Sequence, residues 1–455
     1  MLACGDAAYG GPRAGSANKE ASAGRIARPL VAQVALAVPD AVLQAPTPKA
    51  PPSANVIGAL ERPEALRRFF GALAGLDEGR AHDDVHIVQF GDSHTAADYE
   101  TGPLRRALQA RFGDGGRGFV SVGRPWRFYV QEGVHLDGMS GWTAERGKYA
   151  KGRFVGDGLY GLVGVSIASS QHGARAWTDL STHVSRIEIA YLEQPQGGSM
   201  DVLVDGARVR RITTRGSAVG PGYAATDVTD APHHVELQPV GDGEGRVFGM
   251  SLDRSQVGLT LDALGVNGAR VSNMLTWDEG HFSEQLRHRT ADLVVLAYGT
   301  NESSDDTPLD TYERQLVDAL GRIARAVPAA SCLLLGPPDR ALRSADGTWT
   351  TVSRLYDIIA SQRRVAEAAG CAYYSQLDAM GGAGSIAAWA VESPPRAMLD
   401  RTHLSRDGYA ELGNAIARDL VAGYEAWRAD EGKPPPLPQH PIVTPASEPV
   451  ARFSR

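Results

Sequence analysis

The fold is decided by Val85-His-Ile-Val-Gln-Phe-Gly-Asp-Ser-His-Thr95, an apolar run that ends abruptly at Gly91, Asp92 and Ser93. A near-continuous apolar run is typical of a strand that is buried on both faces of a parallel sheet. Open sheets of this kind place their reactive groups at the carboxyl ends of strands. The segment therefore predicts a central strand, with Ser93 as a candidate nucleophile on the turn that follows it.

The same pattern resumes in the second half of the chain, where apolar runs alternate with amphipathic stretches. Strands are predicted at 259–266, 293–298, 332–335 and 372–377. Helices are predicted at 55–78, 104–112, 271–287, 312–326, 352–368 and 406–427. The alternation of strands and helices predicts an α/β domain with a parallel sheet.

The stretch between the two α/β parts has a different pattern of apolar residues. From 126 to 253 there is no convincing long helix, and short alternating runs such as Ile187–Tyr191 and Val202–Val204 are bounded by turn signals such as Asp205-Gly206. Strands at this spacing predict a jelly-roll-like β-sandwich. We expect this all-β module to be inserted into the α/β domain rather than added at one end.

These patterns divide the chain into five parts. We expect a disordered Pro/Ala-rich tether at 1–54, the first part of the α/β domain at 55–134, the β-module at 135–252, the second part of the α/β domain at 253–428 and a disordered Pro-rich tail at 429–455. An ordinary flexible N-terminus is the alternative to a tether. Met1-Leu-Ala-Cys4 resembles the end of a bacterial lipoprotein signal, so a lipid anchor at Cys4 is one interpretation and an accidental match is the other.

Composition excludes several classes of partner. The 455 residues carry a formal net charge of −7 with no basic stripe, so we expect no nucleic-acid partner. No stretch of about 18 uninterrupted apolar residues occurs, which predicts that the chain has no transmembrane segment. Neither a Cys-x-x-Cys spacing nor a His-Glu-x-x-His motif occurs, so we expect no metal site and no cofactor.

The two internal cysteines, Cys332 and Cys371, lie in or beside apolar runs that are predicted to be strands. Buried reduced thiols are the preferred interpretation, and a disulfide between the two is the alternative. The cysteines therefore do not decide the compartment.

Four short segments follow strand ends or enter a helix: Gly91-Asp-Ser-His94, Gly265-Val-Asn-Gly268, Gly299-Thr-Asn-Glu302 and Asp400-Arg-Thr-His403. Each segment alone is a weak signal, but the ordered set is specific. It resembles the four sequence blocks of the SGNH (GDSL) hydrolases, over residues 57–130 and 258–425. This resemblance implies a three-layer α/β/α domain, which here would carry the inserted β-module.

A serine hydroxyl is a weak nucleophile at neutral pH. It needs a base within about 3 Å and a group that orients the base. His403 and Asp400, three residues apart on one loop before the last helix, are the candidates for the base and the orienting acid. Taken alone, His403 would be interpreted as a structural or surface histidine, and its context favours the catalytic interpretation.

Acyl transfer also needs donors for the oxyanion that forms during the reaction. By the family pattern these are the backbone N–H groups of Ser93 and Gly268 and the side-chain amide of Asn301. Gly265 is the alternative to Gly268, and Asn301 and Gly268 could also be turn residues. Asp92 is predicted to orient the nucleophile turn through hydrogen bonds.

Several other residues near the first block have two interpretations. His94 either lines the pocket or is a hydrogen-bonded structural histidine, and we do not assign it a catalytic role. Trp126, Tyr129 and Trp142 could form a wall on which a sugar stacks, although single aromatic residues at such places are more often core residues.

Finer details resemble the bacterial peptidoglycan O-acetylesterases. They are a carbohydrate-binding-like β-module inserted after the first block, and the segments Phe90-Gly-Asp-Ser-His-Thr-Ala96, Gly115-Gly-Arg-Gly-Phe119 and Leu264-Gly-Val-Asn-Gly-Ala269. The resemblance implies removal of acetyl groups from O-6 of N-acetylmuramic acid, an O-acetylated polysaccharide as partner, and a location in the periplasm or cell envelope. The alternatives are a polysaccharide O-acetyltransferase that uses the same triad and a non-catalytic polysaccharide-binding protein.

Overall fold

A seven-stranded sheet forms the centre of the α/β part of the computed structural model, which describes residues 56–150 and 153–431. The strands, in spatial order, are β1 (Val56–Ile57), β2 (Leu60–Glu61), β22 (Ala372–Ser375), β19 (Ser331–Gly336), β18 (Leu293–Ala297), β3 (Val85–Gly91) and β17 (Leu259–Gly265). The five strands from β22 to β17 are parallel, and β2 joins β22 in antiparallel orientation. The predicted parallel sheet is confirmed.

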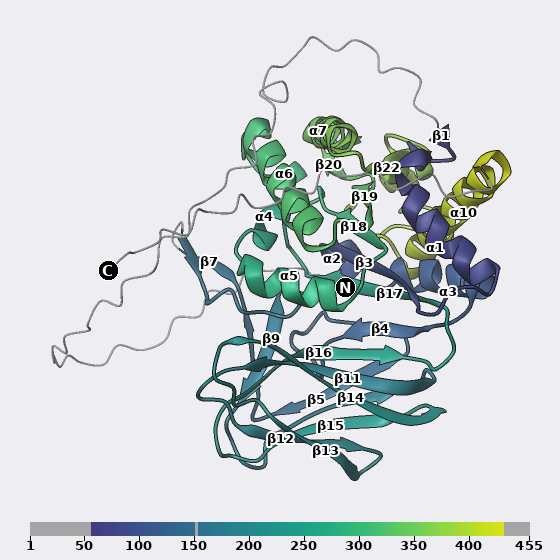
Figure 1. The fold of residues 1–455 in the computed structure, drawn as a ribbon. Coiled ribbons are helices and arrows are strands. Elements are labelled where there is room, and N and C mark those ends of the chain that lie inside the picture. The colour runs from purple at the N-terminus through teal and green to yellow at the C-terminus, as the bar shows by residue number, and fades with distance from the viewer. Residues whose placement is uncertain (1–55, 151–152, 432–455) are drawn as a thin grey trace, which may run out of the picture. The chain divides into compact units, whose positions relative to one another are not determined.

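Helices cover both faces of this sheet, as Figure 1 shows. They are η2 (Pro63–Leu66), α1 (Arg67–Asp77), α2 (Ser93–Ala96), α3 (Thr101–Phe112), α4 (Val271–Met274), α5 (Glu279–His288), η3 (Glu302–Ser304), α6 (Leu309–Ala326), α7 (Ser353–Ala369), α8 (Gln376–Ala379), α9 (Ser385–Trp389) and α10 (Arg406–Glu431). Helices α1, α3 and α10 bury residues such as Leu73, Leu108 and Leu420 in one core. Helices α5, α6 and α7 pack against the other face, where Phe282, Ile323 and Ile358 are buried in a second core.

The β-module consists of two antiparallel sheets. One sheet is ordered β13 (Ala207–Thr213), β12 (Ser199–Val204), β15 (His234–Pro239), β10 (Arg175–Leu180), β5 (Val134–Ser140). The other is ordered β14 (Gly220–Ala231), β11 (Val184–Glu193), β16 (Gly245–Asp253), β9 (Val165–Ser169), β6 (Thr143–Arg146), with β4 (Gly116–Val120) paired to β16. Two small hairpins, β7 (Lys148–Ala150) with β8 (Arg153–Val155) and β20 (Ala341–Arg343) with β21 (Trp349–Thr351), complete the strands. The expected fold class, an α/β domain with an inserted all-β module, is confirmed.

Strand β4 connects the two parts. Asp114 forms a parallel bridge with Leu259 of β17, and β4 then leaves the parallel sheet to pair with β16. Gly116 makes this approach possible, since its φ is +125° and a Cβ at this position would lie 2.5 Å from the Leu252 carbonyl oxygen. The module boundaries at 135 and 252 stay a prediction, and the predicted tether, the possible anchor at Cys4 and most of the predicted tail lie outside the described residues.

Two predicted helices differ from those observed. The helix predicted at 271–287 is split into α4 and α5, because the Asp278 side chain accepts a hydrogen bond from the His281 N–H (2.9 Å) and caps a new helix there. The helical pattern predicted from residue 55 begins with β1 and β2 instead, since the edge of the parallel sheet offers β2 a partner in β22.

The preferred interpretation of the cysteines was wrong. Cys332 and Cys371 form a disulfide, with their Cα atoms 4.8 Å apart. The reason is the pairing of β19 with β22, in which Leu333 is the partner of Ala372 and the two preceding cysteines therefore face each other. This pairing joins positions 39 residues apart in sequence, so local pattern could not predict it.

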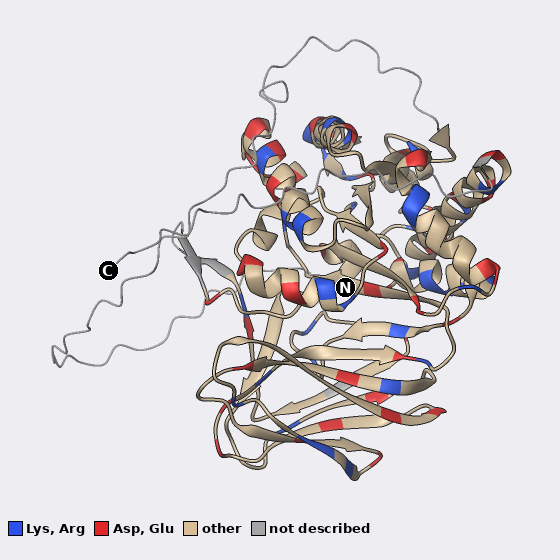
Figure 2. Cartoon of the chain, in the orientation of Figure 1, with Lys and Arg blue, Asp and Glu red and all other residues tan. Residues whose placement is uncertain are grey.

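Charge of both signs is interspersed over the helices and strands (Figure 2). No helix among the described residues combines the length and hydrophobicity that a bilayer crossing requires. Over the same residues there is no cluster of three or more His, Cys, Asp or Glu side chains that could hold a metal ion.

Candidate active site

The candidate site lies where three parallel strands end together. Gly91, the last residue of β3, pairs with Gly265 of β17 on one side and with Ala297 of β18 on the other. Because the strands are parallel, the segments that follow them emerge at the same edge of the sheet. The segments predicted to carry the nucleophile and the oxyanion donors therefore lie next to one another.

The structure brings Ser93, His403 and Asp400 into one hydrogen-bonded chain. The Ser93 hydroxyl oxygen lies 3.0 Å from Nε2 of His403, and Nδ1 of His403 lies 2.7 Å from Oδ2 of Asp400. Ser93 comes from the start of α2, and the other two residues come from the loop before α10, more than 300 residues away. This geometry allows the imidazole to accept the serine proton while the carboxylate holds the ring.

Backbone hydrogen bonds fix the Asp400 carboxylate beneath the ring. Its Oδ1 accepts from the N–H groups of Thr402 and His403, each at 3.0 Å, and Arg401, between Asp400 and Thr402, adopts the left-handed region with a φ of 53°. Burial would raise the pKa of Asp400, but the hydrogen bonds from the His403 ring and from these two N–H groups outweigh burial and hold the pKa below its usual value. Asp400 therefore stays ionised and stabilises a protonated His403.

Gly265 and Gly268 differ in burial and in whether the backbone N–H is free to donate to a ligand. Gly265 is buried against α2, where a Cβ would lie 2.3 Å from the backbone nitrogen of Ala96. Gly268 is exposed on the following turn with a φ of +76°, and its N–H donates to no protein atom in the described part of the chain. Of the two glycines, Gly268 is the one with a backbone donor free to meet a ligand.

Asn301 lies at the start of η3, and its side-chain amide is hydrogen-bonded within the protein. Its Nδ2 donates to the Ala269 carbonyl oxygen at 2.9 Å and contacts Oδ2 of Asp92 at 3.4 Å. The second contact is long for a hydrogen bond, so a substrate oxygen could replace it at little cost. The Asn301 amide thus lies beside both the turn that carries Gly268 and the turn that carries Ser93.

Asp92 and His94 are both buried around the nucleophile. Asp92 caps α2 by accepting from the His94 N–H at 2.9 Å, and burial, with a smaller effect of the nearby Glu302, raises its pKa to about 7. The His94 ring hydrogen-bonds Tyr409 Oη through Nδ1 at 2.9 Å and stacks on the His403 ring with a centroid distance of 5.5 Å. Burial lowers the pKa of His94 to about 3, so this ring is a neutral support for His403.

Glu302 belongs to the third block, and no role was predicted for it. Its carboxylate is buried and accepts from the N–H of Val271 at 2.8 Å through Oε1 and from the N–H of Gly299 at 3.0 Å through Oε2. One side chain therefore holds the turn that carries Gly268 against the turn that carries Asn301. The sequence signal that could have revealed this role is the position of an acidic residue directly after Asn301, the proposed oxyanion donor.

Arg340 is a second residue beside the site for which the sequence predicted no role. Its guanidinium hydrogen-bonds the hydroxyl groups of Ser303 and Ser304 in η3, and its Nε lies 3.4 Å from Oγ1 of Thr402. Arg340 thus connects the asparagine segment to the loop of Asp400. It follows the carboxyl end of β19, so the rule that singled out Ser93 could have found it.

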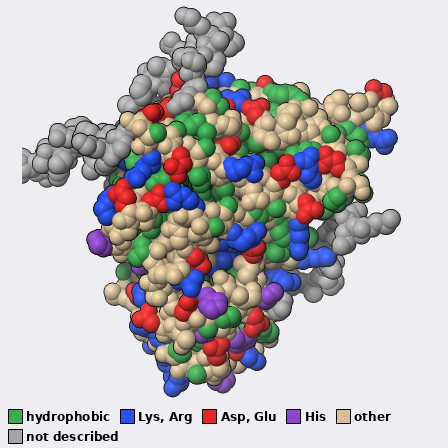
Figure 3. Space-filling model, turned by 90° about the vertical axis from the view of Figure 1, so that its right-hand side faces the viewer, with side chains coloured by type: hydrophobic (Ala, Val, Ile, Leu, Met, Phe, Trp, Pro, Cys, Tyr) green, Lys and Arg blue, Asp and Glu red, His purple; other side chains and the backbone are tan. Residues whose placement is uncertain are grey.

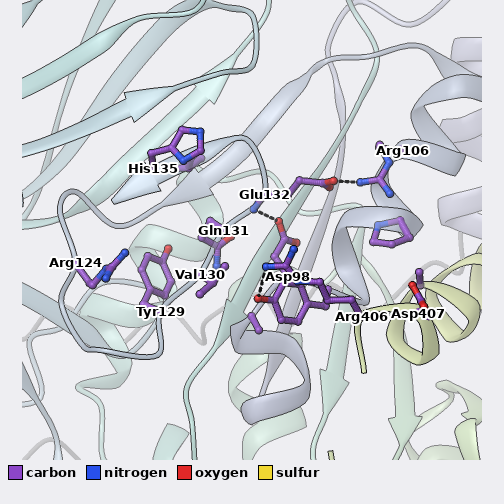
Figure 4. Close-up of a pocket in the computed structure, with 15 residues that line it drawn as sticks. Asp98, Arg106, Arg124, Tyr129, Val130, Gln131, Glu132, His135, Arg406 and Asp407 are labelled. Carbon is purple, nitrogen blue, oxygen red and sulfur yellow. Dashed lines mark hydrogen bonds and ion pairs between the residues drawn. The ribbon is translucent and has the colours of Figure 1, made fainter. Parts of the chain in front are cut away.

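Two cavities flank this site. One, of about 480 Å³, is lined by charged and polar side chains from α3, α10 and the start of the β-module, including Asp98, Arg106, Glu132, His135 and Arg406, as Figure 4 shows. The other, of about 280 Å³, includes Gly268, Asn267, Trp277 and Tyr298 in its wall. The first cavity reaches Ala97, four residues after Ser93, and the second reaches the turn of Gly268.

The three aromatic residues proposed as a stacking wall do not form one. Tyr129 and Trp142 are buried in the core of the β-module, at 1% and 6% exposure. Trp126 is half-buried, packs against Tyr129 and donates from Nε1 to Oδ1 of Asn267 at 3.0 Å. Trp126 therefore supports the turn before Gly268 rather than offering a free face.

Comparison with known proteins agrees with this geometry. Residues 236–411 match the GDSL-like Lipase/Acylhydrolase family, a range that contains Gly268, Asn301, Asp400 and His403 but not Ser93. A solved structure described as "Peptidoglycan O-acetylesterase in action, 5 min" is 25% identical, with a TM-score of 0.65, and the alignment covers 79% of this chain and 96% of the other. The chain carries a GDSL-type hydrolase domain. The resemblance indicated by the four sequence segments is confirmed, and this GDSL hydrolase is a carboxylic ester hydrolase.

Other solved structures share much less with this GDSL hydrolase. A family two carbohydrate esterase from Clostridium thermocellum is 9% identical (TM-score 0.27, covering 58% of this chain and 95% of the other), and one from Cellvibrio japonicus is 11% identical (TM-score 0.26, covering 68% and 98%). No curated protein matches the sequence.

Proposed function

We propose that this hydrolase removes O-acetyl groups from a cell-wall polysaccharide, at O-6 of peptidoglycan N-acetylmuramic acid, through an acetyl-serine intermediate. The observation that carries the proposal is the chain of short contacts from Ser93 through His403 to Asp400. The choice of polysaccharide rests on the similarity to the peptidoglycan O-acetylesterase structure.

In the first half of the proposed reaction, the Ser93 oxygen attacks the acetyl carbonyl carbon while Nε2 of His403 takes the hydroxyl proton. The bond to the sugar oxygen then breaks, and His403 returns this proton to the leaving alkoxide. In the second half, water attacks the carbonyl carbon of the acetyl-serine while His403 takes a proton from it; the bond from this carbon to the Ser93 oxygen then breaks, His403 returns the proton to Ser93, and acetate leaves. Asp400 stays ionised throughout and stabilises the imidazolium.

The negative charge that forms on the acetyl oxygen would meet three donors: the backbone N–H groups of Ser93 and Gly268 and the Asn301 amide. Donors in place before the reaction stabilise such an oxyanion by about 3–4 kcal/mol each. The unpaired N–H of Gly268 and the weak second contact of the Asn301 amide support these assignments.

Two observations support hydrolysis in the envelope. The side chains of His403 and Asp400 are 36% and 48% exposed, so water can reach the acetyl-serine, whereas transfer to a second sugar would need water to be excluded. The Cys332–Cys371 disulfide is typical of proteins that fold outside the reducing cytosol. A periplasmic or envelope location is therefore part of the proposal.

The direct test is a Ser93→Ala variant. We expect kcat on p-nitrophenyl acetate to fall by a factor on the order of 10⁴ or more, because no other hydroxyl takes the place of the nucleophile. Ser344→Ala, on an exposed turn, is the matched control and should keep full activity. Retention of most activity by the Ser93 variant would show that the triad assignment is wrong.

The substrate is tested by measuring acetate release from O-acetylated peptidoglycan beside acetylated xylan and p-nitrophenyl octanoate. We expect the highest kcat/KM on peptidoglycan. Preference for xylan would contradict the choice of glycan, and acetyl transfer to added sugar acceptors in excess of acetate release would contradict hydrolysis.

A further inference from the structure

The larger of the two cavities has a wall of charged side chains that hydrolysis of a small ester does not need. Its volume is about 480 Å³, and its charged lining consists of Arg106, Arg124, Arg406, His135, Asp98, Glu132 and Asp407. Figure 4 shows Arg106 and Arg406 on the helix side of the cavity and Arg124 and His135 on the other side. Sites for neutral small molecules are mostly apolar with a few polar groups, so this wall indicates either a charged ligand or a structural network of ion pairs.

Part of the wall is such a network. The buried Asp98 carboxylate contacts Arg105 at 3.1 Å and Arg117 at 2.7 Å, and Glu132 pairs with Arg106. These pairs satisfy the two carboxylates, because a buried charge without a partner is costly. Three guanidinium groups meet two carboxylates, and Nη1 of Arg117 is buried with no partner among the described residues. The inner wall therefore keeps an excess of positive charge.

Arg406 does not belong to this network. It is the first residue of α10, is exposed, and forms no ion pair with any described residue. Its Nη2 donates to Oη of Tyr99 at 3.1 Å, and its guanidinium lies over the Tyr99 ring, 4.8 Å from the centroid. An arginine at the start of a helix faces the positive end of the helix dipole, so it does not stabilise the helix. The tyrosine thus holds ready a guanidinium that can bind a carboxylate through two N–H groups.

Asp407 adds an unpaired negative charge to the same wall. It directly follows Arg406, is exposed, and also forms no ion pair with a described residue. The cavity therefore presents a cation and an anion next to each other, which matches a ligand that carries both signs. On the face that Figure 3 shows, basic and acidic side chains are interspersed and the described residues form no broad basic surface, so a long polyanion is a poor match.

The cavity begins close to the reacting atoms. It reaches Ala97 at the end of α2, about 6 Å from Ser93 at 1.5 Å per residue, and Arg406 is three residues after His403. Because His403 returns the proton to the sugar oxygen, the sugar that carried the acetyl group lies beside His403. On muramic acid the peptide is attached through O-3, across the sugar ring from O-6. The peptide of a sugar whose acetyl group lies at Ser93 would therefore start one ring width away.

We propose that this cavity binds the peptide carried by the acetylated muramic acid, with Arg406 holding a peptide carboxylate. The inference rests on the proposed function and deepens it, because the preferred substrate is then a peptide-bearing glycan rather than a bare one. Peptides of peptidoglycan carry carboxylates and, on diamino acid residues, ammonium groups, which match Arg406 and Asp407. Binding at this distance from the acetyl group lowers KM without a change in the chemical step.

The kinetic test compares an O-acetylated muropeptide, the same disaccharide after an amidase has removed the peptide, and p-nitrophenyl acetate. For the wild type, we expect KM to be about tenfold lower for the muropeptide than for the peptide-free disaccharide, the usual effect of one hydrogen-bonded charge pair. Arg406→Gln should remove this difference, with kcat on p-nitrophenyl acetate within twofold of the wild type. Arg314→Gln, at an arginine of α6 with a 53% exposed side chain, is the matched control and should keep the preference.

A second readout does not depend on catalysis. In calorimetric titrations with de-acetylated muropeptide, we expect the wild type and Arg314→Gln to bind about tenfold more tightly than Arg406→Gln. Equal affinity of the wild type for muropeptide and peptide-free disaccharide would overturn the inference. Equal weakening of both ligands by Arg406→Gln would also overturn it, and would assign Arg406 to the lactyl carboxylate that the peptide-free sugar carries.

The two proposals can fail separately. If the wild type released no acetate from any peptidoglycan, the proposed function would be wrong, and the titration would still decide whether the cavity binds the peptide. If acetate were released equally well with and without the peptide, the esterase would stand and the peptide site would be wrong.

Discussion

At the scale of single residues, Glu302 connects the parts of the proposed oxyanion hole. A carboxylate can accept from two N–H groups at once, and Glu302 does so with Val271 and Gly299. These N–H groups come from the two turns that present Gly268 and Asn301. The distance between the two donors is therefore set by a side chain that touches neither of them.

We predict that Glu302→Gln lowers kcat on p-nitrophenyl acetate about 10- to 100-fold with little change in KM. A glutamine has one acceptor oxygen, and its NH₂ group would face a backbone N–H, so one buried donor is left without a partner at a cost of about 1–3 kcal/mol. The two turns would move apart, which weakens oxyanion binding more than substrate binding. Steady-state kinetics with thermal unfolding as a check on the fold would measure this.

Asp305→Asn is the matched control, since Asp305 holds the Arg270 side chain on the outer side of the same turn and touches no backbone donor. A smaller loss of kcat is expected there. If both variants lost kcat equally, or if KM alone changed for Glu302→Gln, a positioning role of Glu302 would be wrong.

At the scale of elements, the disulfide joins β19 and β22 at their amino ends. Cys332 is the second residue of β19, and Cys371 directly precedes β22. The candidate site lies at the opposite, carboxyl ends of the parallel strands. Stability and activity should therefore respond separately to loss of this bond.

We predict that Cys332→Ala/Cys371→Ala lowers the free energy of unfolding by about 3–4 kcal/mol, because the bond closes a loop of 39 residues whose entropy the unfolded chain would regain. The kcat at 25 °C should stay within twofold of the wild type. Urea denaturation checks the first expectation and ester hydrolysis the second. Unchanged stability in both the variant and the reduced wild type would contradict the structural role.

At the scale of the whole molecule, one of the hydrophobic cores contains residues of both the β-module and the α/β part. Val165 and Phe248 from module strands are buried in the same cluster as Phe90 and Phe282. Removal of the module would expose this cluster to water. The module is thus coupled energetically to the α/β part.

We predict that the two parts unfold together. Differential scanning calorimetry should give one transition, because the cluster that contains residues of both parts is lost when either part unfolds. Deletion of residues 135–252 should abolish activity on the small ester as well as on polymer. Two separate transitions, or a deletion variant with full activity on p-nitrophenyl acetate, would contradict the shared core.

Much of the fold and site follows from local sequence. The apolar runs at 85–91, 293–298 and 332–335 predicted buried parallel strands, because a strand covered on both faces must be apolar throughout. The four segments indicated Ser93, Asp400 and His403, whose side chains lie within hydrogen-bonding distance in the structure. These features depend on residue type and short spacing, which the sequence contains directly.

Features that depend on contacts between distant segments were decided only by the tertiary structure. The pairing of β19 with β22 made a disulfide of two cysteines that looked like buried thiols. The approach of the two turns gave Glu302 its two backbone partners, and the register of β10 with β5 laid Trp177 on Gly138. The physical reason is common to all three: burial and pairing at a position are set by the neighbour that folding brings there, and local composition does not contain that neighbour.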